Sequence, residues 1–102
     1  MTSITIEVPE KLQKLPGSER DALFRAGLHE AIRARIRQLN AEVAESLAEI
    51  ARFERKYGLT FKRFEAETLP SLDTQQAHED YNDWFYWETV LAEKQRLLAA
   101  MQ

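Results

Sequence analysis

The sequence of 102 residues contains no cysteine and only three glycines, three prolines and two histidines. Without cysteine, the chain can form neither a disulfide nor a zinc site with thiolate ligands. Three separated glycines cannot form the glycine-rich loop that binds nucleotide phosphates. The apolar runs are too short for a membrane span or a signal peptide. We therefore expect a cytoplasmic protein with no membrane partner.

The composition fits one folded domain. Hydrophobic residues make up 44% of the chain and charged residues 30%, which argues against disorder. The formal net charge is −3, but it is unevenly spread: residues 1–40 hold seven Lys or Arg and five acidic residues, whereas residues 41–102 hold seven and twelve. The N-terminal part therefore suits an anionic partner, and the C-terminal part suits a basic one.

One segment near the N-terminus, SITIEVPEKL, has the periodicity of a strand. Apolar Ile4, Ile6 and Val8 alternate there with polar residues, which predicts a half-buried β-strand. A single strand cannot satisfy its own backbone N–H and C=O groups, so we expect it to pair with the same strand of a second chain. The sequence thus predicts a homodimer or higher homo-oligomer.

Residues 18–57 carry a helical pattern. Apolar positions recur at alternating steps of four and three, as in a coiled-coil seam: Ile32, Ile36, Leu39, Val43, Ser46, Ile50, Phe53 and Tyr57. A helix of about 40 residues would be roughly 60 Å long and needs a partner helix alongside. A second stripe consists of Ala41, Ala44, Ala48 and Ala51. It either admits a helix of the second chain or reflects only the helix propensity of alanine on an exposed face.

A returning helix is predicted near the C-terminus. Its seam is interrupted by Lys94 and consists of Trp84, Trp87, Leu91, Leu98 and Met101. The chain is therefore predicted to be a single, mainly α domain with a dimerising strand and turn at 1–17, a long helix at 18–57, a corner with a short helix at 58–75 and a returning helix at 76–102. The helices would form an antiparallel hairpin and, in the dimer, a four-helix bundle.

No pattern predicts catalysis. The densest group of metal-ligand residue types is His78, Glu79, Asp80 and Asp83, but a zinc site would need a second His or a Cys at ligand spacing. Acidic residues in the first turns of a helix also simply complement its dipole. No serine has a convincing base nearby in the pattern. We expect a binding protein rather than an enzyme, with no metal, cofactor or small-molecule substrate.

The stretch EDYNDWFYWETV places four large aromatic residues in succession. Because helical neighbours are rotated by about 100°, one core cannot cover all four. Trp84 and Trp87 fall on the seam, whereas Phe85 is left outside it. We predict a partner-binding surface with aromatic anchors and an acidic rim, made of Phe85, Tyr81, Tyr86, Asp80, Asp83 and Glu88. The alternative is that Phe85 packs under the corner LTFKRF of its own chain.

The N-terminal part has features of a DNA-binding protein. A two-stranded ribbon formed by a dimer can enter the major groove, and basic residues follow in the segment RARIRQ. The candidate DNA-binding residues are Ser3, Thr5, Lys11, Arg33 and Arg37. The alternative for the arginines is a solvated helix face with local ion pairs.

Two regions of the chain resemble small prokaryotic antitoxins. TSITIEVPEKLQKL, followed by FRAGLHEAIRARI, resembles the opening of antitoxins that include ribbon-helix-helix proteins, and FERKYGLTFKRFEAE with HEDYNDWFYWE resembles the C-terminal part of antitoxin-like proteins. The resemblance implies the antitoxin of a type II toxin–antitoxin module, which neutralises a small basic toxin, often a ribonuclease, and binds its own operator DNA. The alternative is a structural helical-hairpin adaptor or assembly protein without DNA binding.

Overall fold

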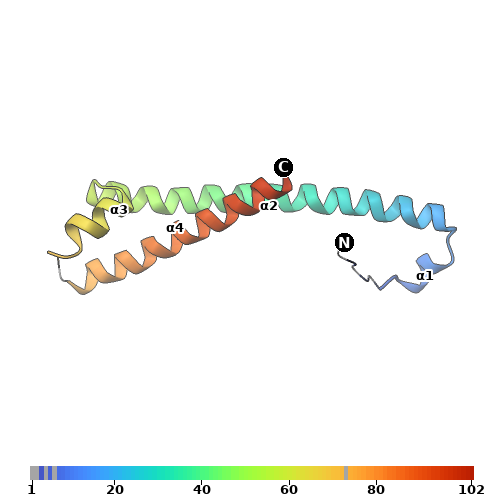
Figure 1. Cartoon of the computed structure of the whole chain (residues 1–102), viewed down its shortest axis with the longest axis horizontal. Coiled ribbons are helices and arrows are strands. Elements are labelled where there is room, and N and C mark those ends of the chain that lie inside the picture. The colour runs from blue at the N-terminus through green and yellow to red at the C-terminus, as the bar shows by residue number, and fades with distance from the viewer. Residues whose placement is uncertain (1–2, 4, 6, 73) are drawn as a thin grey trace. The chain divides into compact units, whose positions relative to one another are not determined.

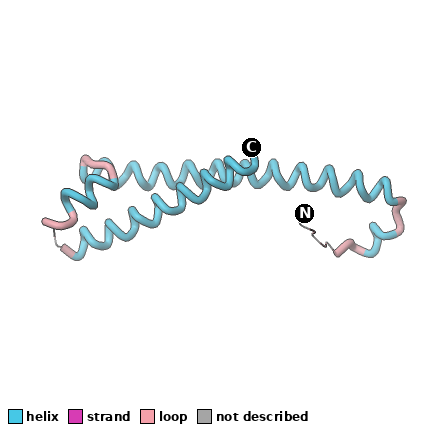
Figure 2. Tube along the Cα trace, in the orientation of Figure 1, coloured by secondary structure: helices cyan, strands magenta, loops and turns pink. Residues whose placement is uncertain are grey.

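The structure is a computed structural model that describes residues 3, 5, 7–72 and 74–102. The helical elements of this part of the chain are α1 (Glu10–Gln13), α2 (Gly17–Tyr57), α3 (Phe61–Arg63), the π-helix η1 (Phe64–Thr68) and α4 (Gln75–Met101) (Figure 1). The described residues include no β-strand (Figure 2). The chain divides within α2 into two compact units, residues 1–34 and 35–102.

The first unit contains the segment that was predicted to be a strand. Its described residues belong to no regular element in the single chain; they are Ser3, Thr5, Glu7 and Val8. Ile4 and Ile6 lie outside the described residues. The side-chain amide of Gln13 donates to the carbonyl of Val8 at 3.1 Å, so α1 contacts the end of this segment. Pairing of the segment with a second chain stays a prediction, because that partner strand would come from another copy.

The part of α2 that belongs to the first unit begins at Gly17, where the carbonyl of Pro16 accepts the N–H groups of Glu19 and Arg20 at 3.0 and 3.1 Å. Several large apolar side chains of this part are exposed: Leu23, Phe24, Leu28 and Ile32. An apolar helix face open to water favours a further partner, and the expected oligomer stays a prediction.

The second unit is an antiparallel helical hairpin. Residues 35–57 of α2 lie beside α4, and α3 and η1 connect them at one end (Figure 1). The side chains of α2 that are buried here all belong to the predicted seam: Leu39, Ser46, Ile50 and Phe53. The predicted long helix and returning helix are thus confirmed. The four-helix bundle needs a second chain and stays a prediction.

Two polar residues lie in the seam of the hairpin without interrupting it. Ser46 is fully buried, and its hydroxyl donates to the carbonyl of Glu42 at 3.0 Å. Lys94 lies in the seam of α4, and its Nζ is 3.2 Å from Oε2 of Glu42. Because each polar group has a partner, neither position carries the cost of an unsatisfied buried group.

Trp84 is the centre of the core and is fully buried. Its ring lies 5.5 Å from that of Phe53 on α2, 5.5 Å from that of Phe61 on α3 and 5.2 Å from that of Phe64 on η1. Aromatic pairs at such separations each add about 0.5–1.5 kcal/mol beyond the area that they bury. One side chain thus holds four helical elements together.

The corner is specified by local sequence. Gly58 has a φ of 68°, a left-handed conformation that glycine adopts without strain, and its N–H closes the end of α2 on the carbonyl of Glu54 at 2.7 Å. Thr60 caps α3 by accepting the N–H of Arg63 at 3.3 Å. Thr74 caps α4 in the same way, by accepting the N–H of Ala77 at 3.1 Å. The direction of the chain reversal is therefore encoded by two caps and one glycine.

Candidate functional site

The four consecutive aromatic residues of α4 have different environments. Trp84 is fully buried, Trp87 packs half-buried against the same core, and Phe85 and Tyr86 are 52% and 57% exposed. The prediction that Trp84 is a core residue and Phe85 is not is confirmed. The ring of Phe85 still lies 6.2 Å from that of Phe61 in the corner. The alternative, in which Phe85 packs under the corner of its own chain, is therefore present in part: one edge of Phe85 contacts the corner, and the other is open.

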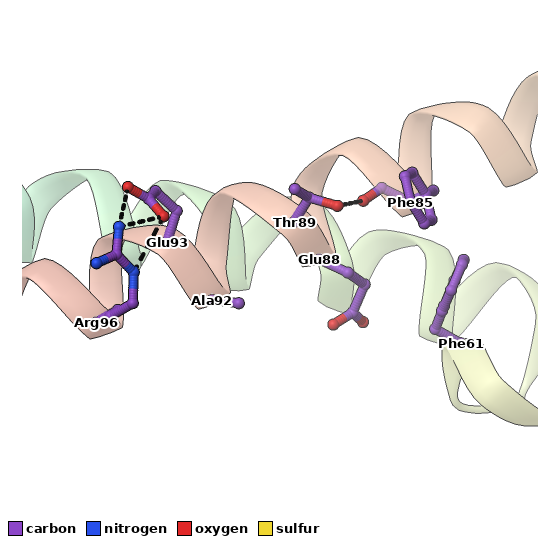
Figure 3. A pocket seen from close by; sticks show the side chains of 7 residues that line it. All are labelled: Phe61, Phe85, Glu88, Thr89, Ala92, Glu93 and Arg96. Atoms are coloured by element: carbon purple, nitrogen blue, oxygen red, sulfur yellow. Dashed lines mark hydrogen bonds and ion pairs between the residues drawn. The ribbon is translucent and has the colours of Figure 1, made fainter.

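An open groove runs along α4 beside Phe85 (Figure 3). It has a volume of about 460 Å³ and is lined by Phe61, Phe85, Glu88, Thr89, Ala92, Glu93 and Arg96. At the end far from Phe61, Arg96 and Glu93 form an ion pair with an N–O distance of 2.7 Å. The volume lies within the range of grooves that accept a ligand or the side chains of a partner.

Tyr81 supports the aromatic end of the groove. Its ring stacks on Phe61 at 5.5 Å, and its hydroxyl donates to the carboxylate of Glu65 at 2.5 Å. The hydrogen bond to Glu65, with a smaller contribution from burial, raises the pKa of the Tyr81 hydroxyl. Because its hydroxyl is already bound within the chain, Tyr81 contributes its ring, rather than its polar group, to the surface beside Phe85.

Glu88 is an acidic residue that lines the groove together with Phe61 and Phe85. Burial raises the pKa of its carboxyl group, the indole of Trp84 partly opposes that rise, and the nearby carboxylate of Glu54 adds to it. The indole N–H of Trp84 makes no hydrogen bond of normal geometry. No ion pair joins Glu88 or Glu54 to a Lys or Arg among the described residues. The carboxylates of Glu88 and Glu54 thus lie near each other, and neither is ion-paired within the described part of the chain.

Tyr86 lies on a different side of α4 from Phe85. It lines a separate depression with Trp87, Val90 and Lys94 and with residues of α2 that include Ser46. Its ring meets that of Trp87 edge to face at 5.1 Å. The predicted partner-binding residues therefore form two surfaces rather than one, and Phe85, Tyr81 and Glu88 belong to the first.

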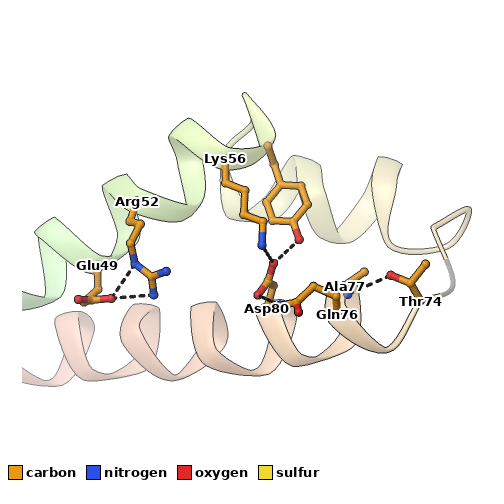
Figure 4. A network of polar contacts seen from close by, with 8 residues as sticks. Glu49, Arg52, Lys56, Thr74, Gln76, Ala77 and Asp80 are labelled. Atoms are coloured by element: carbon orange, nitrogen blue, oxygen red, sulfur yellow. Dashed lines mark hydrogen bonds and ion pairs between the residues drawn. The ribbon is translucent and has the colours of Figure 1, made fainter.

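Asp80 was predicted to lie on the acidic rim, but its side chain is buried inside the hairpin. Its carboxylate accepts hydrogen bonds from Lys56 at 2.6 Å, from the hydroxyl of Tyr57 and from Gln76 at 2.8 Å (Figure 4). This network joins the last turn of α2 to the first turns of α4. Asp80 therefore stabilises the hairpin, while Asp83, one turn further on, is exposed as the prediction requires.

The candidate DNA-binding residues and most of the alanine stripe are exposed. Ser3, Thr5, Lys11 and Arg33 are exposed in the first unit, and Arg37 is exposed in the second. Of the alanine stripe, Ala51 is half-buried, and the exposed members are Ala41, Ala44 and Ala48. The exposure of the DNA-binding candidates and of the alanines is compatible with both alternatives: a surface that binds a partner, or a solvated helix face.

Sequence reasoning missed five residues of the groove: Phe61, Thr89, Ala92, Glu93 and Arg96. Thr89 and Ala92 follow Phe85 by four and seven residues, the spacing of one helix face. That spacing is the signal that would have identified them. Phe61 was predicted only as an apolar residue of the corner, and its position against Phe85 depends on how the corner folds back.

Metal sites, membrane-spanning helices and similarity to known proteins also bear on function. Within the described part of the chain, no three His, Asp or Glu side chains are grouped closely enough to hold a metal ion. None of the described helices is both long and apolar enough to cross a membrane. No protein-family model matches the chain, and neither a curated protein nor a solved structure is significantly similar to it. Functional reasoning therefore depends on the surface of α4.

The Asp80 network predicts how stability depends on pH. Burial raises the pKa of Asp80, but hydrogen bonds from Lys56, Tyr57 and Gln76 outweigh it and hold the pKa below its usual value. The ionised carboxylate therefore stabilises the hairpin above about pH 4, and that stability is lost as the pH falls through the lowered pKa. Burial, with the bond to Asp80, raises the pKa of Tyr57 to about 12. Its contribution is complete below about pH 10 and is lost as the pH rises through about 12.

We predict that Asp80→Asn lowers the free energy of unfolding at neutral pH by about 1–3 kcal/mol, because charge-assisted hydrogen bonds are lost. It should also flatten the acid limb of the stability profile. Urea denaturation at a series of pH values measures both effects. The control is Asp83→Asn on the exposed side of α4, with an expected change within about 0.5 kcal/mol. Equal effects of the two substitutions would contradict the role given to the network.

We predict that Phe85→Ala and Trp84→Ala, although adjacent, differ strongly in stability. Trp84→Ala should cost roughly 3–5 kcal/mol, because it leaves a cavity where four elements meet. Phe85→Ala should cost about 1 kcal/mol, since half of its ring is already in water and only edge contacts are lost. Thermal melts of both variants decide the question. If Phe85→Ala lowers the melting temperature as much as Trp84→Ala, Phe85 is a core residue and the prediction of an exposed anchor is wrong.

Proposed function

We propose that the chain is an antitoxin-type binding protein whose hairpin neutralises a small basic toxin. The observation that supports this function best is the position of Phe85, an aromatic side chain 52% exposed beside a groove on a hairpin whose core is already filled by Trp84. Large aromatic residues with a polar rim are typical anchors of protein interfaces. The excess of acidic residues after residue 40 favours a basic partner.

In the same proposal, a second copy of the chain covers the rest of the apolar surface. Ile4, Ile6 and Val8 would pair with the same residues of the other copy, and the alanine stripe of α2 would admit a second α2. The exposed apolar residues of α2 in the first unit agree with this arrangement. Operator binding through Ser3, Thr5, Lys11, Arg33 and Arg37 would follow from such a dimer. The adaptor alternative shares the hairpin and the dimer but has no toxin and no operator.

The test is co-expression with the product of the neighbouring gene. We expect the two proteins to co-purify and expression of the neighbour alone to arrest growth, with the arrest relieved by this chain. Phe85→Ala should weaken the complex by about 2 kcal/mol or more, so relief of the arrest should be lost at low expression. Lys62→Ala, an exposed change in the corner away from the groove, is the matched control and should leave relief intact.

A neighbouring product that neither binds this chain nor arrests growth would contradict the antitoxin function. A stable complex without any toxicity would instead favour the adaptor. If Phe85→Ala and Lys62→Ala relieve the arrest equally well, the toxin contacts another surface of the chain.

A further inference from the structure

We infer that the groove beside Phe85 recognises a basic side chain of the partner, an arginine or lysine whose charged end lies at Glu88 and whose aliphatic stem lies against Phe61 and Phe85. This inference rests on the proposed function only in assuming that the occupant is a segment of a partner protein. It does not require that partner to be a toxin.

The shape and chemistry of the groove suit a long side chain with a charged end. Phe61 and Phe85 form its aromatic end, and Ala92 leaves room along α4 where a larger side chain would fill the space (Figure 3). Arg and Lys have long apolar stems that pack on such surfaces, and their charged ends are attracted to the faces of aromatic rings. A purely aliphatic side chain would fit the apolar end but would leave the carboxylate of Glu88 without a partner.

The charge of the groove favours a cation at Glu88. Glu88 lines the groove half-buried, close enough to Glu54 for the two carboxylates to repel each other. The other acidic residue of the groove, Glu93, is already paired with Arg96. Glu88 is thus the acidic residue of the groove that has no ion-pair partner among the described residues, and a cation placed beside it offsets the repulsion from Glu54.

The indole N–H of Trp84 connects the groove to the core. Its ring is fully buried, and its indole N–H makes no hydrogen bond of normal geometry. The indole nevertheless partly opposes the rise in the pKa of the Glu88 carboxyl group. Buried indole N–H groups usually have a partner. A cation that draws the Glu88 carboxylate into a fixed position would let that carboxylate accept from the indole as well. Binding in the groove would therefore be coupled to the centre of the core.

These observations predict an unusual combination of effects for Glu88→Gln. The substitution keeps the size and the acceptor oxygen but removes the repulsion with Glu54, so the melting temperature of the free protein should rise. Affinity for a basic ligand should fall. A purely structural Glu88 would behave differently, because its loss would lower the melting temperature and leave binding unchanged.

The test is a double-mutant cycle on the full chain with a synthetic probe. The probe is a short amphipathic peptide that carries one arginine beside leucines, and the matched peptide carries citrulline, a neutral isostere of arginine. Titrations followed by NMR give the affinities and show which amides shift. We expect the arginine peptide to shift the amides of the groove and to bind about 10-fold more tightly than the citrulline peptide. Glu88→Gln should abolish that difference.

The control is Glu79→Gln, which removes the same charge from an exposed site on α4 outside the groove. The 10-fold preference for arginine should survive it. The inference is overturned if both substitutions reduce the preference equally, if the shifted amides lie elsewhere, or if the arginine peptide does not bind. If the double-mutant cycle succeeds but the growth assay fails, the proposed toxin function is rejected, whereas recognition of a basic side chain in the groove is retained.

Discussion

The burial of Trp84 between α2, α4 and the corner is the interaction on which the rest of the second unit depends. Its ring contacts aromatic residues of three other elements: Phe53, Tyr57, Phe61 and Phe64. The returning helix therefore has little freedom to rotate about its axis. The Asp80 network fixes its position along α2 as well, because one carboxylate accepts from both Lys56 and Tyr57.

The position of the groove follows from the burial of Trp84 through the geometry of the helix. Once Trp84 faces the core, the next residue must point about 100° away, and Phe85 is placed at the edge of the corner with half of its ring in water. The same constraint places Glu88, one turn later, beside Phe85 and near Glu54 of α2. The groove and its uncompensated charge are thus consequences of how the core is packed, and no separate scaffold is needed to build them.

Much of the hairpin could be predicted from the sequence, because its signals are local. The seam from Ile36 to Tyr57, the cap at Thr60 and the inward position of Trp84 follow from periodicity and capping. The burial of Asp80 could not be predicted, since Lys56 and Tyr57, its partners on α2, are more than 20 residues away in sequence. The contact of Phe61 with Phe85 likewise depends on the chain reversal. The strand pairing of Ile4, Ile6 and Val8 concerns a second chain, and no property of a single copy can establish it.

Fluorescence quenching tests the central claim most directly. The chain has two tryptophans, so Trp87→Phe leaves Trp84 as the single indole emitter. The account predicts blue-shifted emission that acrylamide quenches only weakly, since the ring is enclosed on all sides. Emission at the wavelength of indole in water, with quenching close to that of free tryptophan, would show that Trp84 is exposed. That result would contradict the packing of the hairpin and the outward position of Phe85 with it.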